Sequence, residues 1–380
     1  MTLTPLQAAP AAGVVPAGAE TPIDQGTFAA AVVHWQKRHG RHHLPWQQSH
    51  EAYRIWLSEI MLQQTQVSTV IGYYERFLER FPTLADLATA RQEDVMPYWA
   101  GLGYYARARN LHRCAQVIMT QHAGQFPKDP AQIAMLPGIG RSTAGAIAAF
   151  AWKVRTPIMD GNVKRVFTRF FGIEGYPGNT AVDKALWTLA HGVMDKAPET
   201  LDIRAYTQGL MDLGASICAR RNPTCGQCPL QNGCHAKANG LQNTLPTPKP
   251  RKLTPIRSCH MLVLLQNGKV LLEQREDRGI WGGLLSLPQF DTEDDLQRFC
   301  LQKDIPLQAS AKMAGLQHVF THFKLDITPW QVRLPEQHLH EPLGGYQWLD
   351  ASGGQGLAVP APVKKILGGL SERQTTLWGD

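Results

Sequence analysis

The spacing of hydrophobic residues divides the chain into two parts. Over residues 27–236 apolar positions recur every three or four residues, which is typical of one face of an α-helix. One such helix is predicted at 67–81, and Asp129 followed by Pro130 predicts the start of another that runs to residue 136. No long alternation of apolar and polar residues occurs here, so the sequence predicts an all-α region.

In the C-terminal third the hydrophobic period becomes two, which is typical of β-strands. Asn267 and Gly268 stand between two such runs and predict a tight hairpin turn. We therefore expect a separate α+β domain, with strands at 259–265, 269–274, 323–330 and 346–349 and a helix near 294–301.

The two parts are joined by a segment of different composition. Residues 245–257 hold four prolines and four cationic side chains but no acid. Such a segment is extended and semi-rigid, and it serves either as a solvated spacer or as a neighbour of a phosphate backbone. The first 24 residues show no periodicity and are expected to be disordered. The predicted organisation is a leader at 1–24, a helical region at 25–236, a linker at 237–257, an α+β domain at 258–370 and a tail at 371–380.

Composition indicates a globular protein, since 43% of the 380 residues are hydrophobic and only 18% are charged. The formal net charge of +7 suits a polyanionic partner but does not identify one. No apolar run approaches the roughly 20 residues that cross a bilayer. A signal peptide begins with basic residues, and here no Lys or Arg precedes Lys37. We expect a soluble cytoplasmic protein, nucleoid-associated if bacterial, and nothing in the sequence demands more than a monomer.

Four of the seven cysteines are crowded together, in the order Cys218, Cys225, Cys228 and Cys234. This crowding predicts a metal site in a reducing compartment rather than a set of disulfides. The spacing leaves zinc and an iron–sulfur cluster both open, because it matches neither a zinc ribbon nor a bacterial ferredoxin. Within the first inter-cysteine loop, Arg220 and Arg221 are candidates for phosphate contacts or for plain surface charge.

A glycine-rich turn, LPGIG at 136–140, precedes a helix expected at 141–152. Gly138 and Gly140 allow the backbone to turn tightly, so that its N–H groups and the helix dipole form a site for an anion. An ordinary helix–helix turn accounts for the same residues. With Ser142 included, the longer run LPGIGRSTAGAI resembles the DNA-binding helix-hairpin-helix of the endonuclease III superfamily.

Three further motifs resemble those of MutY-type adenine DNA glycosylases within that superfamily: LSEIMLQQTQV at 57–67, GLGYYARARN at 101–110 and MDGNVKRV at 159–166. The resemblance covers residues 35–349. It implies an all-α helix-hairpin-helix glycosylase region, whose four cysteines hold a [4Fe-4S] cluster as a structural clamp, joined by a linker to an α+β Nudix-like domain. The implied activity is removal of adenine mispaired with 8-oxoguanine or G in double-stranded DNA, which initiates base excision repair.

Two acidic residues fit that chemistry, because one group must protonate the base while another stabilises a cationic sugar. Glu59 lies in a largely apolar segment, so burial would raise its pKa and keep a proton available. Asp160 precedes Gly161 in an expected polar turn, where it should stay ionised. By resemblance, Glu59 is the general acid on adenine N7 and Asp160 stabilises the sugar. Alone, either would be taken for a surface or turn residue.

The resemblance also implies which residues hold the two bases of the mispair. The adenine pocket is expected to contain Leu44, Trp46, Asn162 and Asp212, although core packing also explains Trp46 and helix-surface charge explains Asp212. His42 stands where the family more often has arginine. The 8-oxoguanine is expected to meet a polar segment and an aromatic wedge, namely Gln63, Gln64, Thr65 and Tyr104.

Ser142 and the C-terminal domain refine the expected activity. Bifunctional endonuclease III relatives carry a lysine at position 142 that attacks the sugar, and a serine cannot form a Schiff base. A monofunctional glycosylase is therefore expected. The pieces WGGLL at 281–285 and HVFTHF at 318–323 resemble a Nudix-like lesion-reading domain, but no glutamate cluster for magnesium follows the two glycines. That domain should bind without hydrolysing, with 8-oxoguanine contacts from Phe320, Thr321 and His322.

Two other functions remain open. One is an endonuclease III-type enzyme acting on oxidised pyrimidines, against which Ser142 and the C-terminal domain both argue. The other is a non-catalytic DNA-binding protein that senses damage or redox state. The presence of Glu59 and Asp160 within their motifs argues against it.

Overall fold

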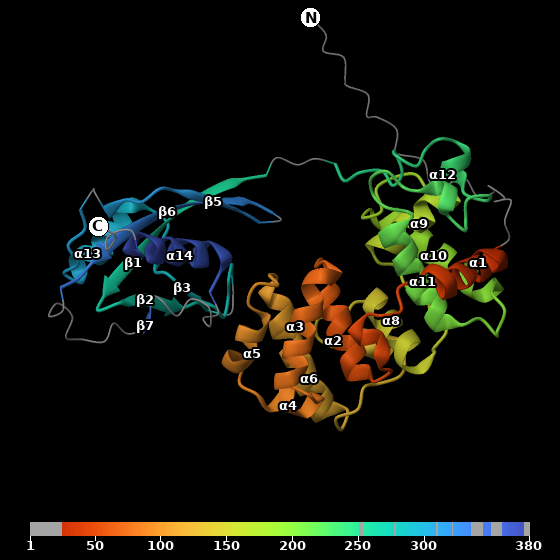
Figure 1. Cartoon of the computed structure of the whole chain (residues 1–380), viewed down its shortest axis with the longest axis horizontal. Coiled ribbons are helices and arrows are strands. Elements are labelled where there is room, and N and C mark those ends of the chain that lie inside the picture. Colours follow the sequence, from red (N-terminus) through yellow and green to blue (C-terminus); the bar gives the residue numbers. More distant parts are fainter. Residues whose placement is uncertain are drawn as a thin grey trace, which may run out of the picture. The chain divides into compact units, whose positions relative to one another are not determined.

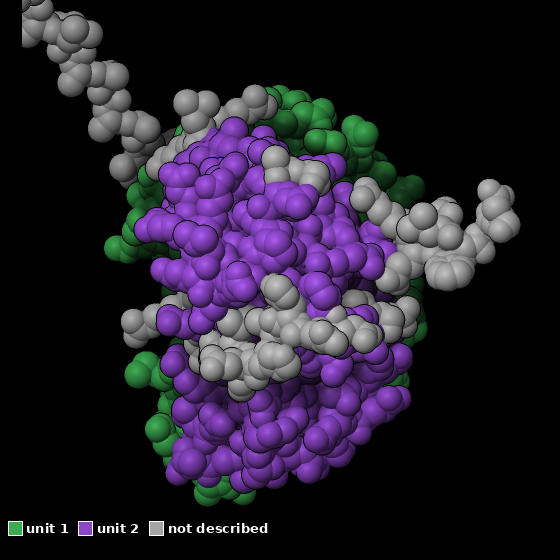
Figure 2. Space-filling view, turned by 90° about the vertical axis from the view of Figure 1, so that its left-hand side faces the viewer, with its two compact units in different colours: residues 1–63, 121–250 green, residues 64–120, 251–380 purple. Residues whose placement is uncertain are grey.

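The computed structural model describes residues 25–250, 254–276, 279–308, 311–320, 322–335, 345–350 and 359–375. The predicted leader at 1–24, Thr321 and residues 376–380 of the predicted tail lie outside the described residues. The chain divides into two compact units, one formed by residues 1–63 and 121–250 and the other by 64–120 and 251–380 (Figure 2). The helical region therefore contributes to both units.

Helices are the regular secondary structure of the first unit over its described residues, and they are joined by loops (Figure 1). Its core forms where apolar faces of helices far apart in sequence meet. Phe28 packs against Phe167, Phe170 and Phe171, with ring centroids 4.8–5.8 Å apart. The elements of this unit are α1 (Gln25–His39), η1 (Pro45–Gln48), α2 (Ala52–Leu62), α7 (Pro130–Ala134), α8 (Arg141–Trp152), α9 (Gly161–Phe171), α10 (Thr180–Lys196), α11 (Ile203–Ser216), η2 (Cys225–Gln227) and α12 (His235–Ala238).

Helices α2 and α8 pack side by side in opposite directions (Figure 1). The Gln63 Nε2 at the end of α2 donates to Thr143 Oγ1 in the first turn of α8, 3.5 Å away. Helix α8 is rich in alanine, and its small buried side chains permit close packing against α2. Its N-cap is Gly140, and its C-cap Lys153 adopts the left-handed conformation at φ 59°. Both ends agree with the helix that the sequence predicts at 141–152.

The second unit begins with four helices, α3 (Val67–Arg80), α4 (Leu84–Thr89), α5 (Gln92–Trp99) and α6 (Tyr105–Gln121). Helix α4 starts with a reciprocal capping box, in which the Thr83 and Asp86 side chains each accept from the other's backbone N–H. Phe77 and Phe81 pack against each other with ring centroids 5.0 Å apart. Helix α3 confirms the helix predicted at 67–81, with its C-terminal end one residue earlier.

The rest of the second unit is a mixed sheet with helices α13 (Glu293–Gln302) and α14 (Ala361–Thr375). The strand order is β3-β2-β1-β6-β5, with β4 also on β1 and β7 also on β2. Asn267 and Gly268 form the predicted hairpin turn, both with positive φ, between β1 and β2. The strands are β1 (Ile256–Gln266), β2 (Lys269–Gln274), β3 (Leu285–Ser286), β4 (Gln289–Phe290), β5 (Leu316–Val319), β6 (Lys324–Arg333) and β7 (Tyr346–Asp350).

The sheet confirms the strands and the helix expected in the C-terminal third and adds elements that the sequence did not predict. Strands β3, β4 and β5 are short, and α14 extends beyond residue 370 into the predicted tail. The central pair β1 and β6 is parallel, with Ile256 opposite Lys324 and Leu265 opposite Arg333. Among the described residues, no helix is long and apolar enough to span a bilayer.

Candidate active site

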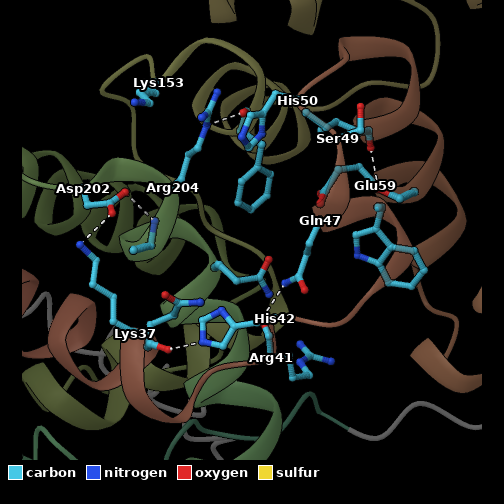
Figure 3. A pocket seen from close by; sticks show the side chains of 17 residues that line it. Lys37, Arg41, His42, Gln47, Ser49, His50, Glu59, Lys153, Asp202 and Arg204 are labelled. Atoms are coloured by element: carbon cyan, nitrogen blue, oxygen red, sulfur yellow. Dashed lines mark hydrogen bonds and ion pairs between the residues drawn. The ribbon is translucent and has the colours of Figure 1, made fainter.

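The Glu59 carboxyl lies in a pocket of about 380 Å³ in the first unit (Figure 3). It belongs to α2, and its neighbours Leu57, Ser58 and Ile60 in that helix are all buried. The pocket is formed by residues from α1, from the loop at 41–50, and from α2, α8 and α11. Trp46 lines it together with Glu59, as the sequence predicts for the adenine pocket.

Burial and, to a lesser extent, the nearby negative charge of Asp160 together raise the pKa of Glu59 to about 8. The carboxyl is thus mostly protonated at neutral pH. This confirms the expectation, drawn from the apolar residues around it, that Glu59 keeps a proton available.

Asp160 is the N-cap of α9, and its Oδ1 accepts a hydrogen bond from Val163 N at 2.7 Å. Burial raises its pKa, while the backbone amides of Val163 and Asn162 and then the charge of Arg165 oppose that rise. The sequence predicted a polar, exposed turn around Asp160, and that part of the expectation is wrong. The turn is half-buried, and the helix N-terminus supplies the groups that favour the anion.

Asp212, predicted in the adenine pocket, is 2% exposed and is not among the residues that line the pocket. Its carboxylate accepts from Arg41 N (2.9 Å), Arg41 Nε (2.7 Å) and Gln208 Nε2 (2.8 Å). Arg41 and Gln208 do line the pocket. Asp212 therefore lies behind the wall of the pocket and orients Arg41, and no motif in the sequence indicates that role.

The other two residues predicted in the adenine pocket also lie outside its lining. Leu44 is buried beside it, and its N–H donates to Gln47 Oε1 at 3.1 Å. Asn162 accepts at Oδ1 from Arg165 Nη2, 2.8 Å away. Gln47, which sequence reasoning missed, lines the pocket, and its Nε2 donates to Arg41 O at 2.9 Å.

The residues predicted at the 8-oxoguanine lie on two turns with strained backbone. Gln64 and Tyr104 are non-glycine residues with φ of 58° and 50°. Tyr104 is 47% exposed. Arg107 was missed as a site residue, although the motif at 101–110 contains it. Its Nη2 donates to Thr65 Oγ1 at 3.1 Å, and its guanidinium lies 5.3 Å from the Tyr104 ring.

The two glycines of the turn predicted as an anion site differ in their backbone conformation. Gly138 has φ 77°, which requires glycine, whereas Gly140 has φ −91° and an added Cβ would meet nothing within 4 Å. No described protein group lies close enough to exclude a side chain at position 140. Gly140 is the N-cap of α8, the end of the helix whose free N–H groups attract anions. The Ser142 hydroxyl accepts from Met159 N at 2.9 Å, so it holds the backbone next to Asp160.

The four cysteines line one small pocket in the first unit. Burial raises the pKa of Cys228 to about 12, and the other three thiols push it in the same direction, so all four lie close together. Arg169 is 3% exposed, and its Nη1 donates to Cys218 Sγ at 3.3 Å and to Ala219 O at 2.8 Å. Among the described His, Cys, Asp and Glu side chains, no three converge closely enough to hold a single metal ion. Arg220 and Arg221 are exposed in the same loop.

An aromatic group in the second unit, the Phe320 cluster, includes one of the three residues predicted to contact 8-oxoguanine from the Nudix-like domain. It consists of Trp281, His318, Phe320 and Phe323. Phe320 stacks on Phe323 at 4.5 Å between centroids and contacts His318 at 4.6 Å and Trp281 at 5.5 Å. Burial lowers the pKa of His318. Phe320 is thus held by neighbours, while Thr321 lies outside the described residues and His322 beside it is exposed.

Comparison with known proteins agrees with this architecture. Residues 57–191 match the family of HhH-GPD superfamily base excision DNA repair proteins, and residues 260–369 match the NUDIX domain. A thermostable thymine-DNA glycosylase of known structure covers 57% of this chain and 97% of its own, at 26% identity and a TM-score of 0.49. The matched families define the class: a helix-hairpin-helix base excision repair protein with a Nudix-like domain.

Two curated relatives narrow the class. The adenine DNA glycosylase of Buchnera aphidicola subsp. Acyrthosiphon pisum (strain APS) is 34% identical over 90% of this chain and 96% of its own. That of Homo sapiens is 32% identical over 89% of this chain and 73% of its own. The chain belongs to the adenine DNA glycosylase family, which confirms the resemblance found in its motifs.

Proposed function

We propose that this protein is a monofunctional glycosylase that removes adenine mispaired with 8-oxoguanine or G from double-stranded DNA. The observation that carries the proposal is the protonated Glu59 in a base-sized pocket, close enough to Asp160 for their charges to interact. A proton donor and an anion side by side are what cleavage of an N-glycosidic bond requires.

In the proposed reaction the adenine leaves the helix stack and enters the pocket, at a cost of a few kcal/mol. Glu59 donates its proton to adenine N7 as the bond between C1′ and N9 breaks and its electrons pass to the base. Asp160, held by the Val163 amide, stabilises the positive sugar or forms a transient adduct with it. Water then adds at C1′ and gives up a proton to a carboxylate, which leaves free adenine and an intact abasic strand.

Ser142 supports the absence of strand cleavage. Its hydroxyl is hydrogen-bonded to Met159 N and offers no amine for a Schiff base. Two results would overturn this part of the proposal: strong strand scission by the purified protein without alkali, together with a covalent protein–DNA adduct trapped by borohydride.

The proposed DNA contacts fall into two groups. The backbone N–H groups at Gly138 and Gly140, with Arg220 and Arg221, suit phosphates, and the open space at Gly140 supports close approach of an outside group. The 8-oxoguanine would meet side chains of both turns and of the β domain, with Tyr104 as the wedge: Gln63, Gln64, Thr65, Phe320, Thr321 and His322. A monomer suffices for these contacts, and we expect it in the cytoplasm with the DNA.

For the four cysteines we propose a [4Fe-4S] cluster. The four thiols line one small pocket, and four cysteines converging on one space suit such a cluster. When bound, the cluster would supply four covalent links that hold the loop as a clamp. Arg169 supports this role, because its donation to Cys218 and to two carbonyls of the loop fixes the thiols from beneath. A brown protein with iron and sulfide is expected, whereas a colourless protein containing zinc would overturn the assignment.

The function is tested by single-turnover base excision from three duplexes, bearing A opposite 8-oxoguanine, A opposite C, and an oxidised pyrimidine. We expect cleavage that depends on alkali and is confined to the first duplex. Activity on the pyrimidine duplex would instead favour an endonuclease III-type enzyme. Tight binding of lesion duplexes without any base release would favour the non-catalytic DNA-binding protein.

A further inference from the structure

The pocket beside Glu59 has an opening far from the proposed DNA-binding turn. Helix α8 begins at that turn and ends at Trp152, about 18 Å away at 1.5 Å per residue. The lining of the pocket includes Phe150 and Lys153 at the far end of α8 but no residue of its first turn. The pocket therefore extends from Glu59 toward the end of the helix that faces away from the turn.

Exposed charged side chains form the rim of this opening (Figure 3). Lys37 and Asp202 form an ion pair at 3.0 Å, with side chains that are 57% and 42% exposed. Arg204 is fixed to the end of α8, because its Nε donates to Phe150 O at 2.7 Å and its Nη2 to Ala151 O at 2.9 Å. Charged groups remain hydrated, so a rim of this kind does not collapse into a dry seal.

Glu59 connects the two sides of the site. It lines the pocket, while Asp160 does not, yet the charges of the two carboxyls interact. The sugar is thus expected on the Asp160 side of Glu59, and the base on the pocket side. A base detached from its sugar already lies in a space that continues to solvent.

We propose that this opening, at the end of the pocket away from the turn, is a purine channel, through which free adenine leaves, and can enter, while the protein remains bound to the abasic strand. The inference rests on the proposed function, since it takes the released base to be adenine. The channel would separate the release of the base from the release of the DNA.

The test uses free 2-aminopurine, a fluorescent isomer of adenine, and a duplex with a tetrahydrofuran abasic analogue opposite 8-oxoguanine. Stopped-flow fluorescence measures purine binding to the full chain alone and to the chain saturated with this duplex. We expect association rates within about threefold of each other. Binding to the free protein that the duplex abolishes would overturn the channel, and so would the lack of purine binding in both states.

A pair of matched variants locates the channel. His50 is an exposed rim residue, and His50→Trp should slow association of 2-aminopurine with the duplex-bound protein about tenfold or more. His34 is exposed on α1 outside the pocket lining, so His34→Trp should leave association unchanged. Equal rates in both variants would place purine entry elsewhere.

Base excision from the A:8-oxoguanine duplex, measured on the same preparations, separates the two claims. Normal excision by the unsubstituted chain, together with purine binding that the duplex abolishes, would reject the channel alone. Absence of excision would reject the proposed function.

Discussion

The pocket beside Glu59 and the Phe320 cluster differ in the side chains that form them. The pocket places ionisable groups on helices whose backbones are fixed by packing, and burial moves the pKa values of both Glu59 and Asp160 upward. The Phe320 cluster is made of stacked rings on strands and a loop, and its one titratable member, His318, is driven by burial toward the neutral form. The first region is suited to moving a proton and the second to shape recognition.

The two regions should therefore tolerate substitutions to different degrees. A carboxyl that must hold a proton at neutral pH depends on its low-dielectric environment. A single substitution can remove the carboxyl or admit water to that environment. Each ring contact contributes about 0.5–1.5 kcal/mol, and the total binding energy is divided among several such contacts. Substitutions in the pocket should therefore affect rate strongly, whereas those in the Phe320 cluster should affect lesion preference moderately.

The largest effect is expected from the carboxyls themselves. Glu59→Gln removes the proton donor and Asp160→Asn removes the anion, and each should slow single-turnover excision about 100- to 10 000-fold with DNA affinity retained. Asparagine is as good an N-cap as aspartate, so Asp160→Asn should fold normally. The control Asp129→Asn changes another N-cap aspartate, on α7, and should keep full activity. Loss of activity in that control would mean that an Asp-to-Asn change at a helix N-cap impairs the protein wherever it lies, so that the effect could not be assigned to the charge of Asp160.

The next effect concerns the wall of the pocket. Asp212→Asn leaves the half-buried Arg41 without its anionic partner, and we expect a loss of about 1–3 kcal/mol in the free energy of unfolding. Denaturant unfolding measures it. Glu51→Gln, which breaks the exposed pair of Glu51 with Arg54, should change stability far less. Equal changes in the two variants would show that burial does not strengthen the Arg41 pair.

A smaller effect should depend on pH. The pKa of Glu59 is about 8 in the folded protein and 4.5 without perturbation, so the folded state holds this proton more tightly over that window. The wild type should lose stability relative to Glu59→Gln as pH rises from about 4.5 to about 8, by about 1–3 kcal/mol because the carboxyl retains some solvent contact. Unfolding at pH 4 and pH 8 tests this. A stability difference between the two proteins that does not vary with pH would contradict the raised pKa.

The smallest effect is expected in the Phe320 cluster. Phe320→Ala removes three ring contacts and should raise KM for the A:8-oxoguanine duplex about tenfold, with an unchanged single-turnover rate and little change for A:G. Val319 is 63% exposed next to it, and Val319→Ala serves as the control. If Phe320→Ala slowed the chemical step as much as it raised KM, the division of tasks between the two regions would be wrong.

The sequence predicted local features well and distant contacts poorly. The limits of α8 follow from Gly140 and from the run of small apolar residues after it, and the protonation of Glu59 follows from its immediate neighbours. The burial of Asp160 could not be predicted, because Gly161 and Asn162 after it are typical of an exposed turn and the groups around it include Glu59, a hundred residues earlier in the chain.

The same limit applies to the pocket walls and to the sheet. Arg41, Gln47 and Arg204 come from elements that meet only in the folded chain, and no single-residue pattern joins them. The parallel pairing of β1 with β6 likewise joins strands far apart in sequence, whereas the hairpin of β1 and β2 carries its own turn signal. The packing of Phe320 against Trp281 was hidden for the same reason.

The central claim is that Glu59 acts as a protonated acid beside Asp160, and the pH dependence of single-turnover excision tests it most directly. With protein in excess over an A:8-oxoguanine duplex, we expect a rate constant that is steady near neutral pH and falls about tenfold per unit well above pH 8. A rate constant that already falls above about pH 5, or one that remains constant to pH 10, would contradict it.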